Sequence, residues 1–341
     1  MRTLGKLLWI LVIFCSANVS VFLPRWLLKI ALNKRSENNL SNDGASFVAH
    51  KNCITYKRKE NHVVTDILKS KDDNKRLSYN ETYNELEKYL IGSYVEDPKL
   101  LRFLRKYWLV PPTKRVYGGE EAKDRYYGQA GQAGVVDQIL KGKTNGVYVE
   151  SGAADGISSN TIFFEKFRNW TGVLVEPIPG MYNKLIGWRR QAWHLNSCLS
   201  SNNKMEKIKF ANFGTFSGNL DSLNKLNGNR MKEYDIGTIT VQCFPFHSVA
   251  AALNFTFIDY FSLDVEGAEM QVLKTIDFTK ISVRVFSIEY RDGINTLSKL
   301  RDLRDFFTKL GYKEWGLVSE KKWMTGQPKD NEGLDVIFYK R

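Results

Sequence analysis

Two apolar runs that each end in an acidic residue constrain this chain more than any other feature. The first, VYVE, ends at Glu150 and opens into a turn of small residues, Ser151–Gly156. The second, VLVE, ends at Glu176, and residues 157–170 between the two runs are long enough for one crossover helix. A strand, a glycine-bearing turn, a helix and a second strand predict a βαβ unit with both carboxylates at one crevice.

The crevice predicted at this turn suits a ligand that contains adenosine. Gly152 and Gly156 allow the backbone to approach a ligand closely, and the helix that follows offers unpaired N–H groups. Glu176, at the tip of the second strand, is placed to bind two ribose hydroxyls. The alternative is that the turn holds no ligand and that Glu176 is a surface acid before Pro177. Dinucleotide binders use a G-x-G-x-x-G sequence, which is absent from this turn.

A third group of acids, Asp264, Glu266 and Glu269, lies where another strand ends and a helix begins, and Glu289 ends a further strand at the same edge. Asp264 or Glu266 is predicted to be a general base that deprotonates a hydroxyl group. The alternative is that the acids stabilise the positive end of the helix dipole. Hard cations take about six to eight oxygen ligands, more than the sequence assigns, so no metal is predicted. His247 is interpreted as a helix cap rather than a base.

Strands and helices alternate through the second half of the chain. This alternation indicates a parallel sheet with both faces covered by helices. The last two strands are joined by a polar loop without a helical pattern, so they are expected to pair antiparallel. The predicted fold is α/β and resembles the class I S-adenosylmethionine-dependent methyltransferase sheet, which is Rossmann-like. The predicted strands are 147–150, 172–176, 192–198, 238–244, 259–264, 283–289, 312–319 and 333–340, and the predicted helices are 158–168, 181–190, 247–253, 267–275 and 296–310.

The N-terminal segment Leu7–Leu23 is uncharged, with basic residues on both sides. At 17 residues it is at the short end for a membrane span, and we expect an uncleaved signal-anchor. A cleaved secretory signal is the alternative, because Cys15–Ala17 resembles a small-residue cleavage site. The predicted organisation is an anchor at 1–24, a flexible basic stem at 25–75, a helical extension at 76–140 and the main domain at 141–341.

The net charge of +13 is interpreted as a basic solvated surface. Neither a zinc-ligand spacing nor an RNA-binding aromatic signature accompanies it, so no nucleic-acid partner is predicted. Cys198 and Cys243 each lie in a predicted strand; they either form a disulfide in an oxidising compartment or remain reduced in the core. A few more glycosylation sequons occur than composition alone predicts, which favours a secretory route; they begin at Asn18, Asn39, Asn80, Asn169 and Asn254.

Several spaced motifs resemble the FkbM family of methyltransferases, and more narrowly its animal, Star-like branch. They lie in the runs VYVESGAADGISSNTIFFEKFRNWTGVLVEP and YFSLDVEGAEMQVLKTI, with Ser159–Thr161 as the SNT motif and Trp170–Gly172 as the WTG strand start. The similarity covers roughly residues 125–341. Bacterial members differ in the first turn, where Glu150 replaces an Asp, and have a histidine at the position of Tyr290.

The resemblance implies a methyltransferase fold with S-adenosylmethionine as its cofactor. For the Star-like branch it implies a single-pass membrane protein with a lumenal or extracellular domain. Such a protein acts in transport between endoplasmic reticulum, Golgi and endosomes, or resides at the plasma membrane. The expected partners are the membrane, a secretory cargo protein and a small-molecule or glycan acceptor. The alternative is an active O-methyltransferase for a hydroxyl or carboxylate. The residues predicted to bind the cofactor are Glu150, Gly152, Asp155, Gly156, Asn160 and Glu176.

Overall fold

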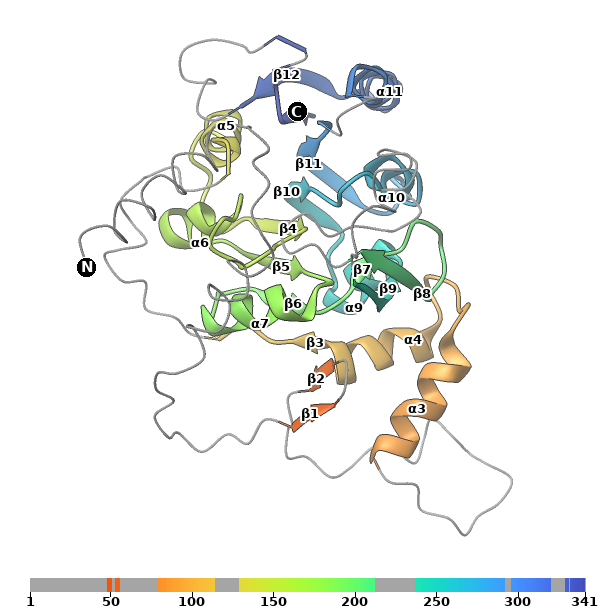
Figure 1. Cartoon of the computed structure of the whole chain (residues 1–341). Helices are drawn as coiled ribbons and strands as arrows, with labels where there is room; N and C mark the ends of the chain where they lie inside the picture. The colour runs from red at the N-terminus through yellow and green to blue at the C-terminus, as the bar shows by residue number, and fades with distance from the viewer. Residues whose placement is uncertain are drawn as a thin grey trace, which may run out of the picture. The chain divides into compact units, whose positions relative to one another are not determined.

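The computed structural model describes residues 48–50, 53–55, 79–113, 129–211, 237–291, 296–319, 329–330 and 332–340 (Figure 1). These residues belong to one compact unit, Val48–Arg341. The predicted anchor Leu7–Leu23 lies outside the described residues. No helix in the described part is both long and apolar enough to cross a membrane. Within the predicted stem, β1 (Val48–His50) and β2 (Cys53–Thr55) form a short antiparallel pair.

An eight-stranded sheet forms the centre of the fold. Five adjacent strands run parallel, while β13 is antiparallel to both of its neighbours, as the polar loop before it predicted. The short β3 pairs antiparallel with β6 at the other edge. In spatial order the strands are β12 (Lys313–Val318), β13 (Asp335–Tyr339), β11 (Ser282–Glu289), β10 (Phe257–Leu263), β4 (Val147–Ser151), β5 (Thr171–Val175), β6 (Trp193–Leu195) and β3 (Leu109–Val110).

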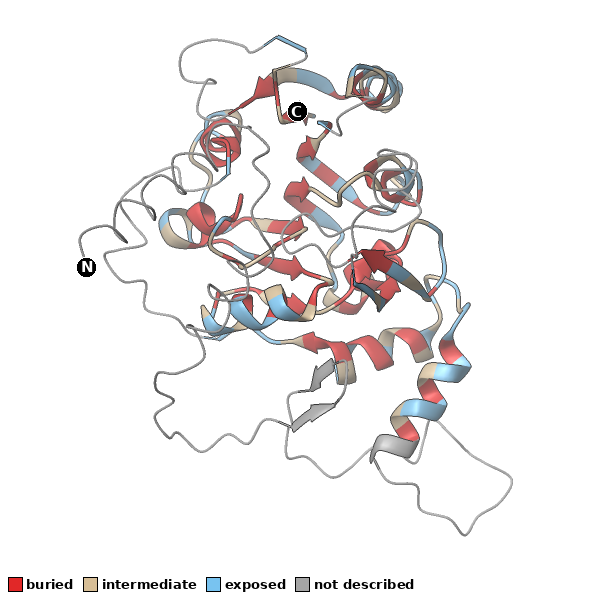
Figure 2. Ribbon diagram, viewed as in Figure 1, coloured by how far each residue is buried: buried red, intermediate tan, exposed pale blue. Residues whose placement is uncertain are grey.

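Helices cover both faces of this sheet, because successive strand residues point to opposite sides and both sets are apolar. Val149, Phe261 and Phe286 pack with helices on one face, whereas Tyr148 and Tyr260 pack with helices on the other. The strands are largely buried (Figure 2). The first face is covered by α9 (Phe246–Leu253), α10 (Glu269–Lys274) and α11 (Thr296–Lys309), and the second by α5 (Gln132–Ile139), α6 (Ile162–Arg168) and α7 (Pro179–Gly187).

The N-terminal helices extend the first core cluster. Asp97 caps α4 (Pro98–Phe103) by accepting a hydrogen bond from Lys99 N at 2.8 Å, and Pro98 occupies the first turn, where a missing N–H costs nothing. Leu100 and Phe103 are buried in the cluster that includes α9. Each fully buried side chain of this kind contributes about 1.5–3 kcal/mol. The other two elements of this part are α3 (Tyr79–Leu90) and a π-helix, Leu104–Trp108.

A second, three-stranded sheet corrects the expectation of a single sheet. The predicted strand 238–244 forms as β9 (Thr238–Phe244), but it pairs with β7 (Cys198–Leu199) and β8 (Glu206–Ala211) rather than with the main sheet. The predicted strand 192–198 is divided into β6 and β7, because the chain leaves the main sheet after Leu195. The strand β8 was not predicted, although its sequence EKIKFA alternates polar and apolar residues.

Candidate functional site

Five adjacent strands each have one residue, at or just beyond the end of the strand, in a row along the edge where the parallel strands end. Glu176, Gly152 and Asp264 directly follow β5, β4 and β10, Glu289 ends β11, and Asp335 begins the antiparallel β13. Glu289 and Asp335 are direct neighbours across the β11–β13 pair. The residues one step earlier are also paired across the sheet, namely Val175, Ser151, Leu263 and Ile288. The sheet register therefore brings four acids and one glycine to a single edge.

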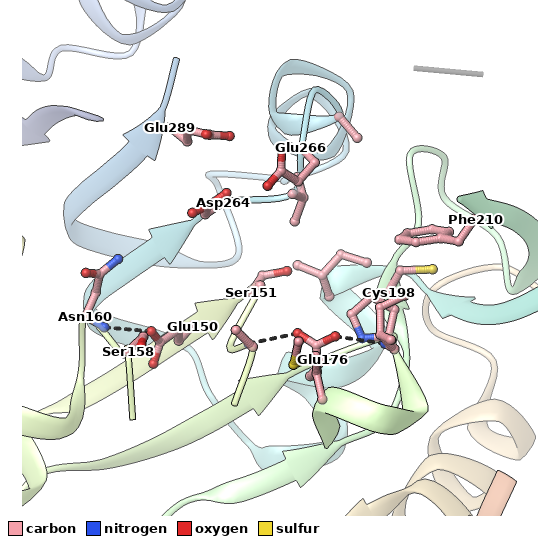
Figure 3. Close-up of a pocket in the computed structure, with 18 of the residues that line it drawn as sticks. Glu150, Ser151, Ser158, Asn160, Glu176, Cys198, Phe210, Asp264, Glu266 and Glu289 are labelled. Carbon is pink, nitrogen blue, oxygen red and sulfur yellow. Dashed lines mark hydrogen bonds between the residues drawn. The ribbon is translucent and has the colours of Figure 1, made fainter. Parts of the chain in front are cut away.

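A cavity of about 340 Å³ lies at this edge. Its main-sheet side includes five of the predicted site residues together with Glu289. The opposite side comes from α7 and the small sheet. Figure 3 shows Asp264, Glu266 and Glu289 grouped at one end of the pocket and Cys198 and Phe210 at the other. The main-sheet side includes Glu150, Gly152, Asn160, Glu176 and Asp264, and the opposite side includes Ile178, Met181, Cys198, Leu199, Ile208 and Phe210.

Glu150 is held by the segment Ser159–Thr161. Its Oε2 accepts hydrogen bonds from the Ser159 hydroxyl at 2.6 Å and the Thr161 hydroxyl at 2.5 Å, and its Oε1 accepts one from the Asn160 backbone N–H at 2.8 Å. Burial raises the pKa of Glu150, while these hydrogen bonds and the nearby Arg190 oppose the shift. With a single donor, Oε1 retains acceptor capacity on the cavity side.

Arg190 holds the segment Ser159–Thr161 in place through hydrogen bonds. This role was not predicted from the sequence. Its side chain is fully buried and forms an ion pair with Glu165 at 2.7 Å. It also donates to the Gly156 carbonyl at 2.6 Å and to the hydroxyls of Ser159 and Thr161 at 3.0 Å each. No pattern in the sequence indicates this role, because an arginine at the end of a predicted helix such as 181–190 is normally exposed.

Glu176 is buried at the tip of β5 and closes the glycine turn. Its two carboxylate oxygens accept hydrogen bonds from the backbone N–H groups of Ala154 and Ile178, each at 2.8 Å. Burial raises the pKa of this carboxyl to about 8, and the negative charge of Asp264 adds to the rise. Each oxygen has one protein donor, so each keeps a lone pair for a ligand in the cavity.

Gly152 can be no other residue in this conformation. Its φ is +87°, and a Cβ placed on it would lie 1.8 Å from the carbonyl oxygen of Asp264. Asp155 accepts hydrogen bonds from the N–H groups of Ile157 and Ser158, so it fixes the turn. Asp155 and Gly156 are not among the described residues that line the cavity. The structure therefore brings six of the eight predicted residues to the cavity wall, and these two shape the turn beneath it.

Asn160, His247 and Tyr290 each form a hydrogen bond within the protein. Asn160 donates from Nδ2 to the Ser262 hydroxyl at 3.1 Å, which ties the segment to β10. His247 accepts a hydrogen bond from the Asp277 N–H at 2.6 Å, which joins α9 to the segment after α10; the N-cap of α9 is Pro245, so the interpretation of His247 as a helix cap is wrong. Tyr290 donates its hydroxyl to the Asp330 carbonyl at 2.9 Å. Neither His247 nor Tyr290 belongs to the described cavity lining.

The acids at one end of the cavity crowd together. Carboxylate oxygens of Asp264, Glu269 and Glu289 all lie within 4.8 Å of one another. Glu269 is balanced, because it accepts two backbone hydrogen bonds and forms an ion pair with Lys299 at 2.7 Å. Burial raises the pKa of Asp264 to about 6 and that of Glu266 to about 8, and neighbouring carboxylates reinforce both shifts. A raised pKa near neutrality suits proton acceptance from a substrate.

A disulfide between Cys198 and Cys243 fastens the small sheet beside the cavity. It joins β7 to β9, and Cys198 itself lines the pocket. Of the two alternatives for these cysteines, the structure has the bonded one. The bond therefore ties one strand of this wall, β7, to the central strand of the small sheet.

Comparisons with known proteins relate this domain to methyltransferases. Residues 150–314 match the family model described as the methyltransferase FkbM domain, and the match begins at Glu150. No match was found among curated proteins.

Three solved structures share a low similarity with the chain. A protein described as an rRNA methylase of Clostridium thermocellum is 7% identical, with a TM-score of 0.33 over 61% of this chain and 96% of that one. A protein described as an RNA methyltransferase of Pyrococcus horikoshii is 10% identical, with a TM-score of 0.31 over 75% and 96%. A human methyltransferase 10 domain-containing protein is 9% identical, with a TM-score of 0.33 over 75% and 96%.

Proposed function

We propose that the methyltransferase FkbM domain at residues 150–314 binds S-adenosylmethionine in the cavity and transfers its methyl group to a hydroxyl or carboxylate oxygen. The observation that carries this proposal is the row of Glu176, Gly152 and Asp264 around one left-handed turn. From β4 the sheet continues through β5 and β6 in one direction and through β10 and β11 in the other. Ligands of open α/β sheets bind at such a reversal, outside the carboxyl ends of the strands.

The residues at the point where the strand order reverses, beside β4, fit S-adenosylmethionine. The free lone pairs of Glu176 suit two neighbouring hydroxyl groups of a ribose. Glu150 and Asp264 provide negative charge for a cationic amino group and a sulfonium. The bare backbone of Gly152 permits close approach of the ligand between them. The order and direction of the strands from β6 to β12, with β13 inserted antiparallel, agree with a class I methyltransferase sheet.

The cofactor supplies an electrophilic methyl group, and the chain has to position and deprotonate the acceptor. Holding the acceptor oxygen in line with that methyl group supplies most of the rate enhancement in such a transfer. Asp264 and Glu266 lie at the polar end of the cavity, and either can take the proton from a hydroxyl group. Ile208 and Phe210 of the small sheet form an apolar wall against which the ligands can pack.

A calorimetric titration of the whole chain with S-adenosylmethionine tests this function. We expect saturable binding that Glu176→Ala weakens at least tenfold, a loss of about 1.4 kcal/mol. Asp305→Ala on the exposed side of α11 is the matched control and should leave the affinity unchanged. No heat and no thermal shift at millimolar ligand would exclude cofactor binding.

We further propose that this domain lies in the lumen of the secretory pathway, in a Star-like single-pass membrane protein that acts in endoplasmic reticulum, Golgi and endosomal transport of cargo. The Cys198–Cys243 disulfide supports the compartment, since such bonds persist in oxidising surroundings. Two sequons begin at Asn169 and Asn254, which are both exposed. Glycosidase treatment of the cellular protein should increase its mobility, and Asn169→Gln with Asn254→Gln should reduce that change. An unchanged mobility would contradict a lumenal domain.

A further inference from the structure

The acidic end of the cavity holds more negative charge than cofactor binding requires. Asp264, Glu266 and Glu289 line this end, a carboxylate oxygen of Glu269 lies within 4.8 Å of those of Asp264 and Glu289, and Asp335 is the cross-strand neighbour of Glu289. The nearest balancing cation among the described residues is Lys299, which pairs with Glu269. Like charges at such separations are stable in a buried place only if protons or a cation neutralise them.

The three closest carboxylates have the spacing of ligands around one ion. Oxygens of Asp264, Glu269 and Glu289 lie within 4.8 Å of one another. Calcium binds oxygen at about 2.3–2.6 Å, so two of its ligands can be up to about 5 Å apart. Magnesium binds at about 2.0–2.1 Å and would require a tighter group. The arrangement therefore fits an ion of calcium size without rearrangement of the strands.

Asp335 provides a second observation that is independent of this spacing. Its side chain is only 2% exposed, and its Oδ1 has no hydrogen-bond partner among the described residues. Its Oδ2 accepts a single hydrogen bond from Gln132 at 3.1 Å. As the direct cross-strand neighbour of Glu289, it projects to the same face of the sheet. A buried carboxylate oxygen without a donor is costly, which points to a cation on this side of the cluster.

We propose that Asp264, Glu269 and Glu289, supported by Asp335 behind them, bind a calcium-sized divalent cation at the acidic end of the cavity. The sequence predicted no metal because the acids of the Asp264–Glu269 segment offered too few ligands. The structure brings a carboxylate oxygen of Glu289 to within 4.8 Å of those of Asp264 and Glu269, and the sheet register places Asp335 beside Glu289. The side of the ion that faces the cavity is left for water or for an acceptor oxygen. A hydroxyl group bound there loses its proton more readily, and only this last role rests on the proposed methyl transfer.

Calcium titration of the whole chain, first stripped with a chelator, tests the cation site without S-adenosylmethionine. We expect one saturable event in calorimetry and a rise in the melting temperature, with manganese as a second probe. Asp264→Asn and Glu289→Gln should each weaken calcium binding at least tenfold. Asp305→Asn, an equivalent change at an exposed position of α11, should have no effect.

A second readout separates loss of the site from loss of the fold. In the presence of chelator, the Glu289→Gln variant should melt at the same temperature as the wild-type protein or higher, because the substitution removes like-charge repulsion. Addition of calcium should no longer stabilise this variant. Absence of heat and of any melting shift with millimolar calcium and manganese would overturn the proposal, and so would an equal response of Glu289→Gln and Asp305→Asn. Titration with S-adenosylmethionine in chelator is scored separately, so failure of the cofactor site and failure of the cation site are distinguishable.

Discussion

Arg190 and Glu165 form an ion pair in which neither side chain is exposed to solvent. The pair lies outside the glycine turn Ser151–Gly156. Arg190 also donates to Ser159 and Thr161, which in turn hold Glu150. Glu165 accepts a hydrogen bond from the Tyr148 hydroxyl as well. The position of Glu150 thus depends on a charge pair two contacts away.

Arg190→Met should lower the free energy of unfolding by about 3–5 kcal/mol, because it leaves Glu165 buried without its counter-charge. Urea denaturation followed by circular dichroism measures this loss. Arg304→Met is the control, since Arg304 pairs with Glu314 and Asp330 in a partly exposed position. Each of these two exposed pairs is worth about 0–1 kcal/mol. Losses of similar size in the two variants would contradict a special role for the buried pair.

Gly152→Ala should abolish S-adenosylmethionine binding and destabilise the protein by at least about 2 kcal/mol, since strain at positive φ and the clash with Asp264 add together. Calorimetry and urea denaturation report the two effects. The control is Gly180→Ala in α7, where an added Cβ meets no atom within 4 Å. That change should stabilise the protein by about 0.4–1 kcal/mol through the unfolded state. Normal cofactor affinity in Gly152→Ala would refute the geometry assigned to the turn.

The ligand-free protein should lose stability as pH rises. Burial raises the pKa of Glu176 to about 8, of Asp335 to about 7 and of Asp264 to about 6. In the unfolded chain these carboxyls titrate near pH 4. Between the two values the folded protein retains protons that the unfolded chain releases, so the free energy of unfolding falls by up to about 1.4 kcal/mol per pH unit for each group.

Urea denaturation at steps from pH 5 to pH 8 measures this slope, and Glu176→Gln should flatten it. His194 acts with the opposite sign, because burial lowers its pKa to about 4 and the unfolded chain binds the proton first as pH falls. Its contribution is limited to pH values below about 6.5. A slope that Glu176→Gln leaves unchanged from pH 7 to pH 8 would contradict the raised pKa of this carboxyl.

Reduction of the Cys198–Cys243 disulfide should lower the free energy of unfolding by about 2–4 kcal/mol, since the bond closes a loop of 45 residues. Melting curves with and without a reductant check this value. Cys198→Ser combined with Cys243→Ser should reproduce the reduced protein and should no longer respond to the reductant. Because Cys198 lines the cavity, reduction should also weaken cofactor binding.

Local signals in the sequence predicted most of the main sheet and the glycine turn. Apolar runs and terminal acids located β4 and β5, and a polar loop indicated the antiparallel pair β12–β13. The partner of β9 could not be predicted, because a strand pattern carries no information on which sheet the strand joins. Asp335 was missed for the same reason, since only the register places it beside Glu289. Arg190 was missed because its burial depends on tertiary contacts.

One wall of the cavity belongs to the main sheet, and the other comes from α7 and the separately hydrogen-bonded small sheet. Residues on β8 can therefore be exchanged without disturbing the strand register that assembles the acids. Specificity for the molecule that enters can change by substitution at Ile208 or Phe210, while the chemistry on the opposite side is conserved. In this architecture, selectivity and reactivity are open to independent evolution.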